Sequence, residues 1–156
     1  MKWLIYLSIF LFSTSLLAQQ GNTELALRTK NFNTEKGNLA LQGYDAVSYF
    51  SGEPQKGQKS LSATYKNILY LFVSAKNLAT FNASPDKYEP AYGGWCAYAM
   101  GAKGEKVEVD AENFKIIKGK NYLFYKDFFS NTINDWNKDE ASLFGKAEIN
   151  WKKIYK

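Results

Sequence analysis

The chain contains a single cysteine, Cys96, so no disulfide can form within it and a packed core has to hold the fold together. The sequence can supply such a core, because 46% of its 156 residues are hydrophobic and 17% are aromatic. A chain of this length is enough for one domain. We therefore expect one domain with an apolar core and a free thiol whose role needs an explanation.

Histidine is absent from the sequence, which excludes several kinds of site. Neither Ser-His-Asp nor Cys-His catalytic groups can be assembled, and metal sites with imidazole ligands are excluded as well. The formal net charge of +5 is modest, and the lysines are spread along the chain. This distribution is typical of a solvated basic surface, so we expect no binding to nucleic acid.

The N-terminal segment MKWLIYLSIFLFSTSLLA, residues 1–18, has the features of a secretory signal peptide. Lys2 supplies a positive charge, and residues 3–17 form an apolar stretch shorter than the roughly 20 residues of a membrane-spanning helix. Residues 19–37 are polar and are expected to form a leader before a domain at residues 38–156. The sequence thus predicts an exported monomer, periplasmic or secreted, with no membrane span after cleavage.

Two hairpins dominate the pattern of the predicted domain. The first joins LSATY to ILYLFVS through Lys66 and Asn67, and asparagine tolerates the left-handed conformation of a tight turn. Its second strand is apolar on both faces, which predicts a central position in the sheet. The second hairpin lies in FKIIKGKNYLFY, with its turn at 118–121. We expect an α+β fold in which these hairpins form a small antiparallel sheet.

Short helices and a helical C-terminus complete the prediction. Ser74 is a candidate N-cap for a helix through Phe81, and Pro85 suits the first position of another. Residues 39–50 contain alternating apolar side chains and are expected to form a strand. Residues 95–100 should form a helical turn or two that Gly101 ends. Helical spacing also relates several aromatic and apolar side chains near the C-terminus: Phe128, Phe129, Ile133, Trp136, Phe144, Ala147, Trp151 and Ile154.

Three stretches carry a resemblance to a known family. They are GYDAVSYF, the segment YKNILYLFVSAKNLATFNASPDKYEPAYGGWCAYAMG and the tail DWNKDEASLFGKAEINWKKI. In order and spacing they resemble the YHS-domain-containing proteins of the exported bacterial type, over nearly the whole predicted domain. The resemblance implies a small α+β fold in which a two-strand hairpin and the following helix form the YHS unit.

The resemblance also bears on metal binding and on Cys96. In related metal-handling domains, a pair of cysteines occupies the positions of Val73 and Asn77. The three-residue motif that gives the YHS domain its name occupies the positions of residues 61–63. This chain has neither the cysteines nor the triplet, so metal binding is not carried over to that region. Some members of the exported family have selenocysteine at the position of Cys96, which implies that the chalcogen atom itself is useful there.

The first hypothesis for Cys96 is thiol redox or electrophile chemistry. The residue follows Gly93 and Gly94 at the start of a predicted helix, where backbone N–H groups can lower a thiol pKa from about 8.5 to roughly 3.5–7.5. Because no second cysteine can resolve an oxidised product, turnover would need an external thiol or a redox partner protein. The opposite interpretation is a buried cysteine that acts as a small apolar side chain.

Other residues could assist such a thiol. Asp45 in GYDAV is the candidate acid or base, and Tyr44, Tyr92 and Tyr98 could supply hydroxyl groups. An aspartate after a glycine turn also commonly caps backbone N–H groups, and tyrosines commonly pack in the core. Whether the protein is an enzyme stays open at this point.

Two further hypotheses need no catalysis. Cys96 and Met100 are four positions apart, so a helix would present both sulfurs on one face, and this pair of ligands favours Cu(I). Alternatively, Tyr44, Tyr92 and Tyr98 could join Trp95 in an aromatic pocket for a small ligand or a partner peptide.

Overall fold

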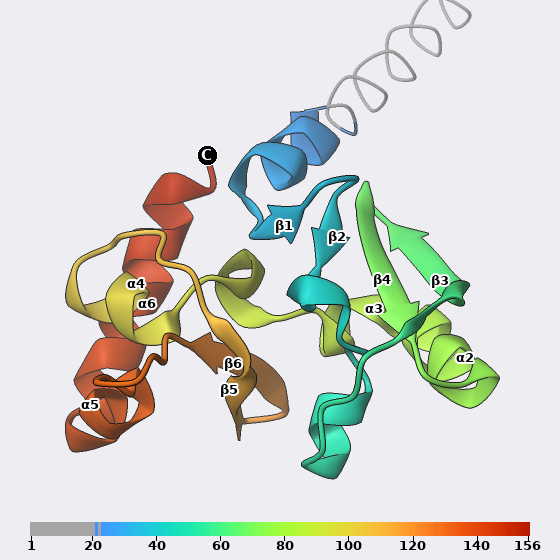
Figure 1. Ribbon diagram of the computed structural model, residues 1–156. Coiled ribbons are helices and arrows are strands. Elements are labelled where there is room, and N and C mark those ends of the chain that lie inside the picture. Colours follow the sequence, from blue (N-terminus) through green and yellow to red (C-terminus); the bar gives the residue numbers. More distant parts are fainter. Residues whose placement is uncertain (1–20, 22) are drawn as a thin grey trace, which may run out of the picture.

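The structure is a computed structural model that describes residue 21 and residues 23–156. The predicted signal peptide, residues 1–18, lies outside the described residues. The fold is α+β, as the sequence predicts, with a four-stranded sheet, a two-stranded sheet and a helical C-terminus (Figure 1). Within the described ranges, no helix combines the length and the apolar character that crossing a membrane requires.

The larger sheet contains the first predicted hairpin. Its strands run in the order β1 (Thr34–Glu35), β2 (Leu39–Ala40), β4 (Ile68–Phe72) and β3 (Gln58–Tyr65). The central position predicted for β4 is confirmed, since β3 pairs with it on one side and β2 on the other. Lys66 and Asn67 form the turn with φ angles of 45° and 66°. The sheet is mixed and not purely antiparallel, because β2 runs parallel to β4.

The second hairpin forms a sheet of its own. Strands β5 (Asp110–Ile117) and β6 (Lys120–Phe124) pair with each other, and the turn at Lys118 and Gly119 has positive φ angles. The strand expected within residues 39–50 is reduced to β2. The chain then continues through two short 3-10 helices, η1 (Leu41–Gly43) and η2 (Ser48–Ser51), stabilised by local hydrogen bonds.

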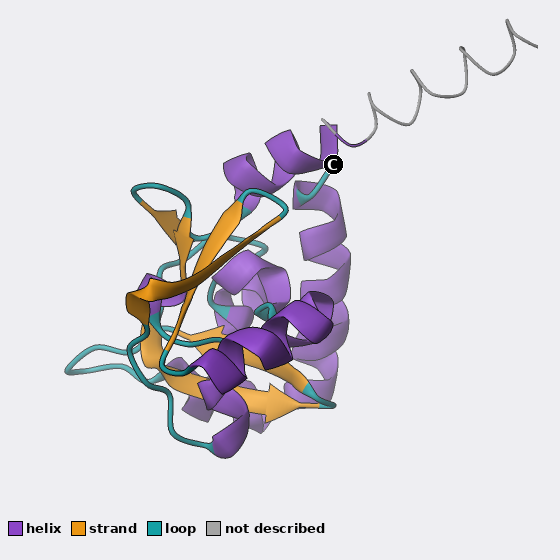
Figure 2. Ribbon diagram, turned by 90° about the vertical axis from the view of Figure 1, so that its right-hand side faces the viewer, coloured by secondary structure: helices purple, strands orange, loops and turns teal. Residues whose placement is uncertain are grey.

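Helices pack alongside the strands of both sheets, as the purple and orange ribbons of Figure 2 show. The helices are α2 (Ala75–Ala83), α3 (Pro85–Tyr88), η3 (Ala91–Gly94), α4 (Ala97–Ala102), α5 (Thr132–Lys138) and α6 (Glu140–Ile154). The predicted cap is confirmed, because the Ser74 hydroxyl accepts a hydrogen bond of 3.1 Å from the Asn77 amide. Helices α2 and α3 lie near the larger sheet, whereas α4, α5 and α6 gather beyond hairpin β5–β6 (Figure 1).

Part of the segment predicted to be a polar leader belongs to the fold. Residues 23–31 are helical, and strand β1 follows them and pairs with β2. The side chains of Arg28 and Asn31 are buried, and Phe32 packs against the core. The prediction that the domain begins at residue 38 is therefore corrected, because polar residues of this segment have partners inside the domain.

The core consists of two clusters of apolar side chains. One lies around the larger sheet and includes Tyr49, Ile68, Tyr70, Phe72 and Phe81. The other lies between hairpin β5–β6 and the C-terminal helices and includes Met100, Phe124, Trp136, Leu143 and Ala147. Candidate site residues Tyr92 and Met100 belong to the second cluster.

The spacing of Phe128 and Phe129 predicts that they are core residues of a helix, and this prediction is wrong. They lie in the loop before α5 and are 93% and 91% exposed. The carboxylate of Asp127 accepts hydrogen bonds from the amides of Phe129 and Ser130, which holds this stretch in a turn. The helix begins only at Thr132, where Asn131 caps it.

Gly101 does not end α4, since the helix continues to Ala102. Its lack of a side chain serves another purpose, because a Cβ atom at Gly101 would lie 2.6 Å from the backbone oxygen of Leu143. The glycine therefore allows α4 and α6 to pack closely together.

We predict that Gly101→Ala lowers the free energy of unfolding by about 1–3 kcal/mol, because the new methyl group forces the two helices apart. The matched control is Gly145→Ala in α6, where nothing lies within 4 Å of the new Cβ. This control should raise stability by about 0.5–1 kcal/mol. Urea unfolding of both variants measures the difference, and equal effects would contradict the close-packing role.

Candidate functional site

Cys96 is fully buried, with 0% of its surface exposed. It precedes α4 as the N-cap residue, but its side chain makes no capping hydrogen bond. The prediction that the sulfur points at free N–H groups of the helix is therefore wrong. The sulfur instead turns toward the end of β6 and the start of α5.

Two hydrogen bonds join Cys96 to these two elements, and a third joins the elements to each other. The Tyr125 amide donates to Sγ at 3.3 Å, and the hydroxyl of Thr132 donates to the Tyr125 carbonyl at 2.8 Å. Because that hydroxyl has used its only proton, it accepts the remaining bond from the thiol, with Sγ and Oγ1 3.6 Å apart. The thiol is thus both donor and acceptor in a closed ring that fastens the loop at 126–131 to α4. This arrangement fits the interpretation of Cys96 as a buried structural residue.

Met100, the other predicted copper ligand, is also fully buried and packs in the second core cluster. Among the described residues, no group of three or more His, Cys, Asp or Glu side chains is placed to hold a metal ion. Copper binding through Cys96 and Met100 therefore stays a prediction, as does redox chemistry at Cys96.

Asp45 is fully buried, and none of its hydrogen bonds involves Cys96. One carboxylate oxygen accepts hydrogen bonds from the amides of Val47 and Ser48, and the other accepts them from the Val73 amide and the Asn77 side chain. The side chain thus connects the start of η2 to the end of β4 and to α2. Its contacts explain Asp45 as a structural residue and do not bring it to the thiol.

Of the four aromatic residues predicted to form one pocket, Tyr44 packs against the first core cluster, apart from the other three. The Tyr44 hydroxyl donates to Glu112 at 2.6 Å, and this bond raises the pKa of Tyr44 to about 12. Trp95 donates from its indole nitrogen to the carbonyl of Asn31 at 2.6 Å. Tyr98 packs on the second core cluster from α4. Tyr92, Trp95 and Tyr98 thus share the second core cluster, whereas Tyr44 does not join them.

A different pocket of about 370 Å³ lies between the N-terminal helix, η3, β6 and α6. Its aromatic lining residues are Phe32, Tyr92, Tyr122, Trp151 and Tyr155. Its charged lining residues are Glu24, Arg28, Glu89, Lys120 and Glu148. We call this site the Trp151 pocket. Of the predicted site residues, Tyr92 and Gly93 belong to it and the others do not.

The backbone beneath the Trp151 pocket has an unusual conformation. Tyr92, Gly93 and Gly94 have φ angles of 51°, 60° and 89°, so three successive residues are in the left-handed region. A Cβ atom at Gly93 would lie 3.0 Å from the Trp151 ring and 3.1 Å from Phe32. The two glycines thus allow a tight backbone, which brings the wall residues Trp151 and Phe32 close to η3.

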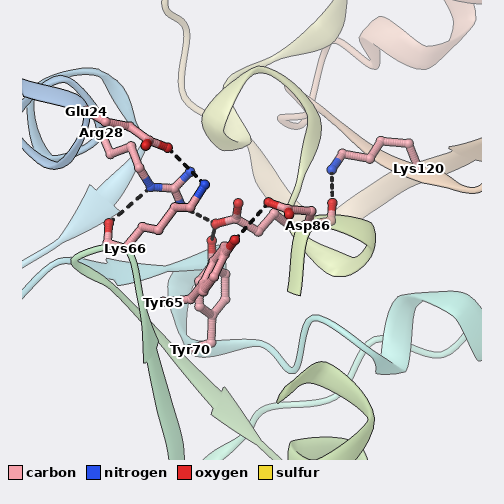
Figure 3. A network of polar contacts seen from close by, with 8 residues as sticks. Glu24, Arg28, Tyr65, Lys66, Tyr70, Asp86 and Lys120 are labelled. Carbon is pink, nitrogen blue, oxygen red and sulfur yellow. Dashed lines mark hydrogen bonds and ion pairs between the residues drawn. The ribbon is translucent and has the colours of Figure 1, made fainter. Parts of the chain in front are cut away.

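A buried ion pair forms one side of the pocket. The Arg28 guanidinium donates to the Glu89 carboxylate, which also accepts a 2.6 Å hydrogen bond from the Tyr70 hydroxyl. Arg28 donates in addition to the Lys66 carbonyl, and Lys66 pairs with Glu24 at 2.9 Å (Figure 3). Burial disfavours the charged guanidinium, but the hydrogen bond and charge of Glu89 outweigh it and raise the pKa of Arg28. The pair therefore stays charged and anchors the N-terminal helix.

The tyrosines of the pocket remain neutral hydrogen-bond donors. Burial raises the pKa of Tyr122 to about 12, and burial together with the nearby charge of Glu148 raises that of Tyr92 still further. Tyr92 donates to the Glu148 carboxylate at 3.1 Å. Within the described part of the chain, the Tyr122 hydroxyl and the Trp151 indole N–H have no hydrogen-bond partner.

Sequence reasoning missed most of the Trp151 pocket. Arg28 and Phe32 were assigned to the leader, although Glu24, Arg28 and Phe32 recur at a spacing of four and so share one helix face. In the same way, Glu148 precedes Trp151 and Tyr155 by three and seven positions on one face of the C-terminal segment. The spacing of residues on these two helix faces was the sequence signal from which the pocket walls could have been predicted.

Comparison with known proteins adds no further evidence, since no family model, no curated protein and no solved structure matches this chain. The resemblance to exported YHS-domain proteins therefore stays a prediction.

We predict that Arg28→Met destabilises the protein by about 3–5 kcal/mol, because it leaves the Glu89 carboxylate buried without a counter-charge. The double variant Arg28→Met/Glu89→Gln should recover part of this loss, since glutamine still accepts from Tyr70. As a control, Lys138→Met breaks the exposed pair with Asp135 and should cost less than about 1 kcal/mol. Urea unfolding of all three tests the prediction, which a small effect of Arg28→Met alone would contradict.

We also predict that iodoacetamide alkylates Cys96 at least about a hundredfold more slowly in the native protein than in urea, because the thiol is reached only after opening. The measurement is the alkylation rate at increasing urea concentration. Comparable rates in the two states would show an accessible thiol and would favour redox chemistry instead.

Proposed function

We propose that this protein is a non-catalytic binding module that holds a small, ring-bearing molecule in the Trp151 pocket. The observation that carries the proposal is the concentration of five aromatic side chains around one cavity of about 370 Å³. Volumes of roughly 300–1,000 Å³ with aromatic walls and a few polar groups are typical of small-molecule sites. Export, as the N-terminal segment predicts, would place this module outside the cytoplasm.

Several features support a site that is formed before the ligand arrives. Trp151 stacks on Tyr155 and meets Phe32 edge-on, with ring centroids 5.4 Å and 6.3 Å apart. Tyr92 contacts both Trp151 and Tyr122 through its ring. Because each wall residue is held by a neighbour, little conformational freedom would be lost on binding.

The proposal favours binding over catalysis because of where the reactive groups lie. Cys96 is enclosed in its own hydrogen-bond ring and does not line the Trp151 pocket. The tyrosines that do line it have raised pKa values and would not act as bases near neutral pH. The pocket residues are thus suited to packing and hydrogen bonding.

Filling the cavity tests the proposal. Ala91 lines the pocket and is buried, so Ala91→Leu places a larger side chain inside it. With p-cresol as a neutral probe, we expect amide NMR shifts at Tyr92, Tyr122 and Trp151 that saturate, and Ala91→Leu should weaken binding by at least about tenfold.

The matched control is Ala141→Leu, which changes an exposed alanine beside a different surface hollow on α6. It should leave p-cresol binding unchanged. Shifts confined to other surfaces, or equal binding to the wild type and the Ala91→Leu variant, would overturn the proposal. Circular dichroism of both variants checks that the fold is retained.

A further inference from the structure

The charged side chains around the Trp151 pocket are not all neutralised by partners within the protein. Arg28 pairs with Glu89. Glu24 pairs with Lys66, a residue that does not line the pocket. Two charges remain, Lys120 from β6 and Glu148 from α6. Neither forms an ion pair with any residue that the structure describes. The pocket thus has one unpaired positive and one unpaired negative group on different walls.

Lys120 is held by a neutral partner. Its ammonium group donates to the backbone carbonyl of Asp86 at 2.5 Å (Figure 3). Burial lowers the pKa of Lys120, and the negative charges of Glu89 and Asp86 offset this only in part. An ammonium group in this position has two more protons to donate, and a bound anion would offset part of the cost of its burial.

Glu148 is a negatively charged group with unused hydrogen-bonding capacity, as Lys120 is a positively charged one. Its only hydrogen-bond partner in the described chain is the Tyr92 hydroxyl, at 3.1 Å. A carboxylate can accept about four hydrogen bonds, so most of its capacity is unused. A ligand ammonium group would satisfy this carboxylate and would also lie among the aromatic rings, whose faces attract cations.

The lining of the same pocket is also aromatic and carries two unused donors. The hydroxyl of Tyr122 and the indole N–H of Trp151 have no partner in the described part of the chain. A ligand with an apolar or aromatic body would cover these rings, and an acceptor group on it could pair with either donor.

We infer that the ligand of the Trp151 pocket is a zwitterion with an aromatic body, of the free amino-acid class, whose carboxylate pairs with Lys120 and whose ammonium group pairs with Glu148. This inference rests on the proposed function and adds the chemical class of the ligand. A neutral ring would leave both charges unpaired, and a singly charged ligand would leave one of them so.

The inference is tested by calorimetry with three probes that share a phenyl ring. L-Phenylalanine carries both charges, 3-phenylpropionate carries only the carboxylate, and phenethylamine carries only the ammonium group. We expect phenylalanine to bind at least about tenfold more tightly than either single-charge probe, since it makes one more charged hydrogen bond than each of them.

Charge variants then assign each end of the ligand. Lys120→Met should weaken phenylalanine and 3-phenylpropionate by about tenfold or more and leave phenethylamine unchanged. Glu148→Gln should weaken phenylalanine and phenethylamine in the same way and spare 3-phenylpropionate. Both side chains are partly exposed, so the variants should fold, and urea unfolding checks that they do.

Each outcome separates this inference from the proposed function. If p-cresol binds and Ala91→Leu abolishes its binding, but phenylalanine binds no better than the single-charge probes, the zwitterion is overturned and the binding module stands. If neither p-cresol nor any of the three probes binds, both fail. Loss of all three charged probes in both charge variants would indicate a structural role for the two residues and would likewise overturn the assignment.

Discussion

The ion pair between Arg28 and Glu89 joins the first helix of the described chain to the turn after α3, and it does so where water is largely excluded. Removing two charges from water is costly, and the cost is offset only when both groups are fully hydrogen-bonded. Here the Tyr70 hydroxyl and the Lys66 carbonyl supply the additional bonds. The position of the N-terminal helix, and with it one wall of the Trp151 pocket, follows from this arrangement.

A second polar arrangement determines the position of the C-terminal helices. The ring formed by Cys96, Tyr125 and Thr132 connects the start of α4, the end of β6 and the first residue of α5. Each member is both donor and acceptor, so no polar atom of the ring is left unsatisfied in the core. Sulfur is suited to this place because it is apolar enough to be buried and still takes part in hydrogen bonds.

The elements that could be predicted from the sequence depend on neighbouring residues. Two examples are the turn at Lys66 and Asn67 and the helix cap at Ser74. Each involves residues within a few positions of one another, so a short stretch of sequence is enough to predict it. Arg28 could not be predicted in the same way. In the sequence it is one of several charges in a polar segment, and its partner Glu89 is identified only when the chain is folded.

Of the residues that line the Trp151 pocket, only two were predicted from the sequence, and both belong to η3. Gly93 was singled out as part of the Gly-Gly segment before Cys96, and Tyr92 as a possible hydroxyl donor or aromatic pocket residue. Both line the pocket. The remaining walls come from segments whose aromatic residues look like ordinary core in the sequence. Phe128 and Phe129 were predicted to lie in a core helix but lie in an exposed loop. The Asp127 carboxylate accepts hydrogen bonds from the amides of Phe129 and Ser130, which favours a turn there over a helix.

The walls of the Trp151 pocket come from opposite ends of the chain, with Arg28 and Phe32 near one end and Trp151 and Tyr155 near the other (Figure 1). Bringing such distant segments together costs loop-closure entropy, and the contacts that compensate for it form only when the whole chain is in place. A molecule bound between them acts as a non-covalent cross-link of the two ends. Occupancy of the pocket would therefore oppose separation of the helix at residues 23–31 from α6, which makes resistance of these two helices to proteolysis a direct readout of the bound state.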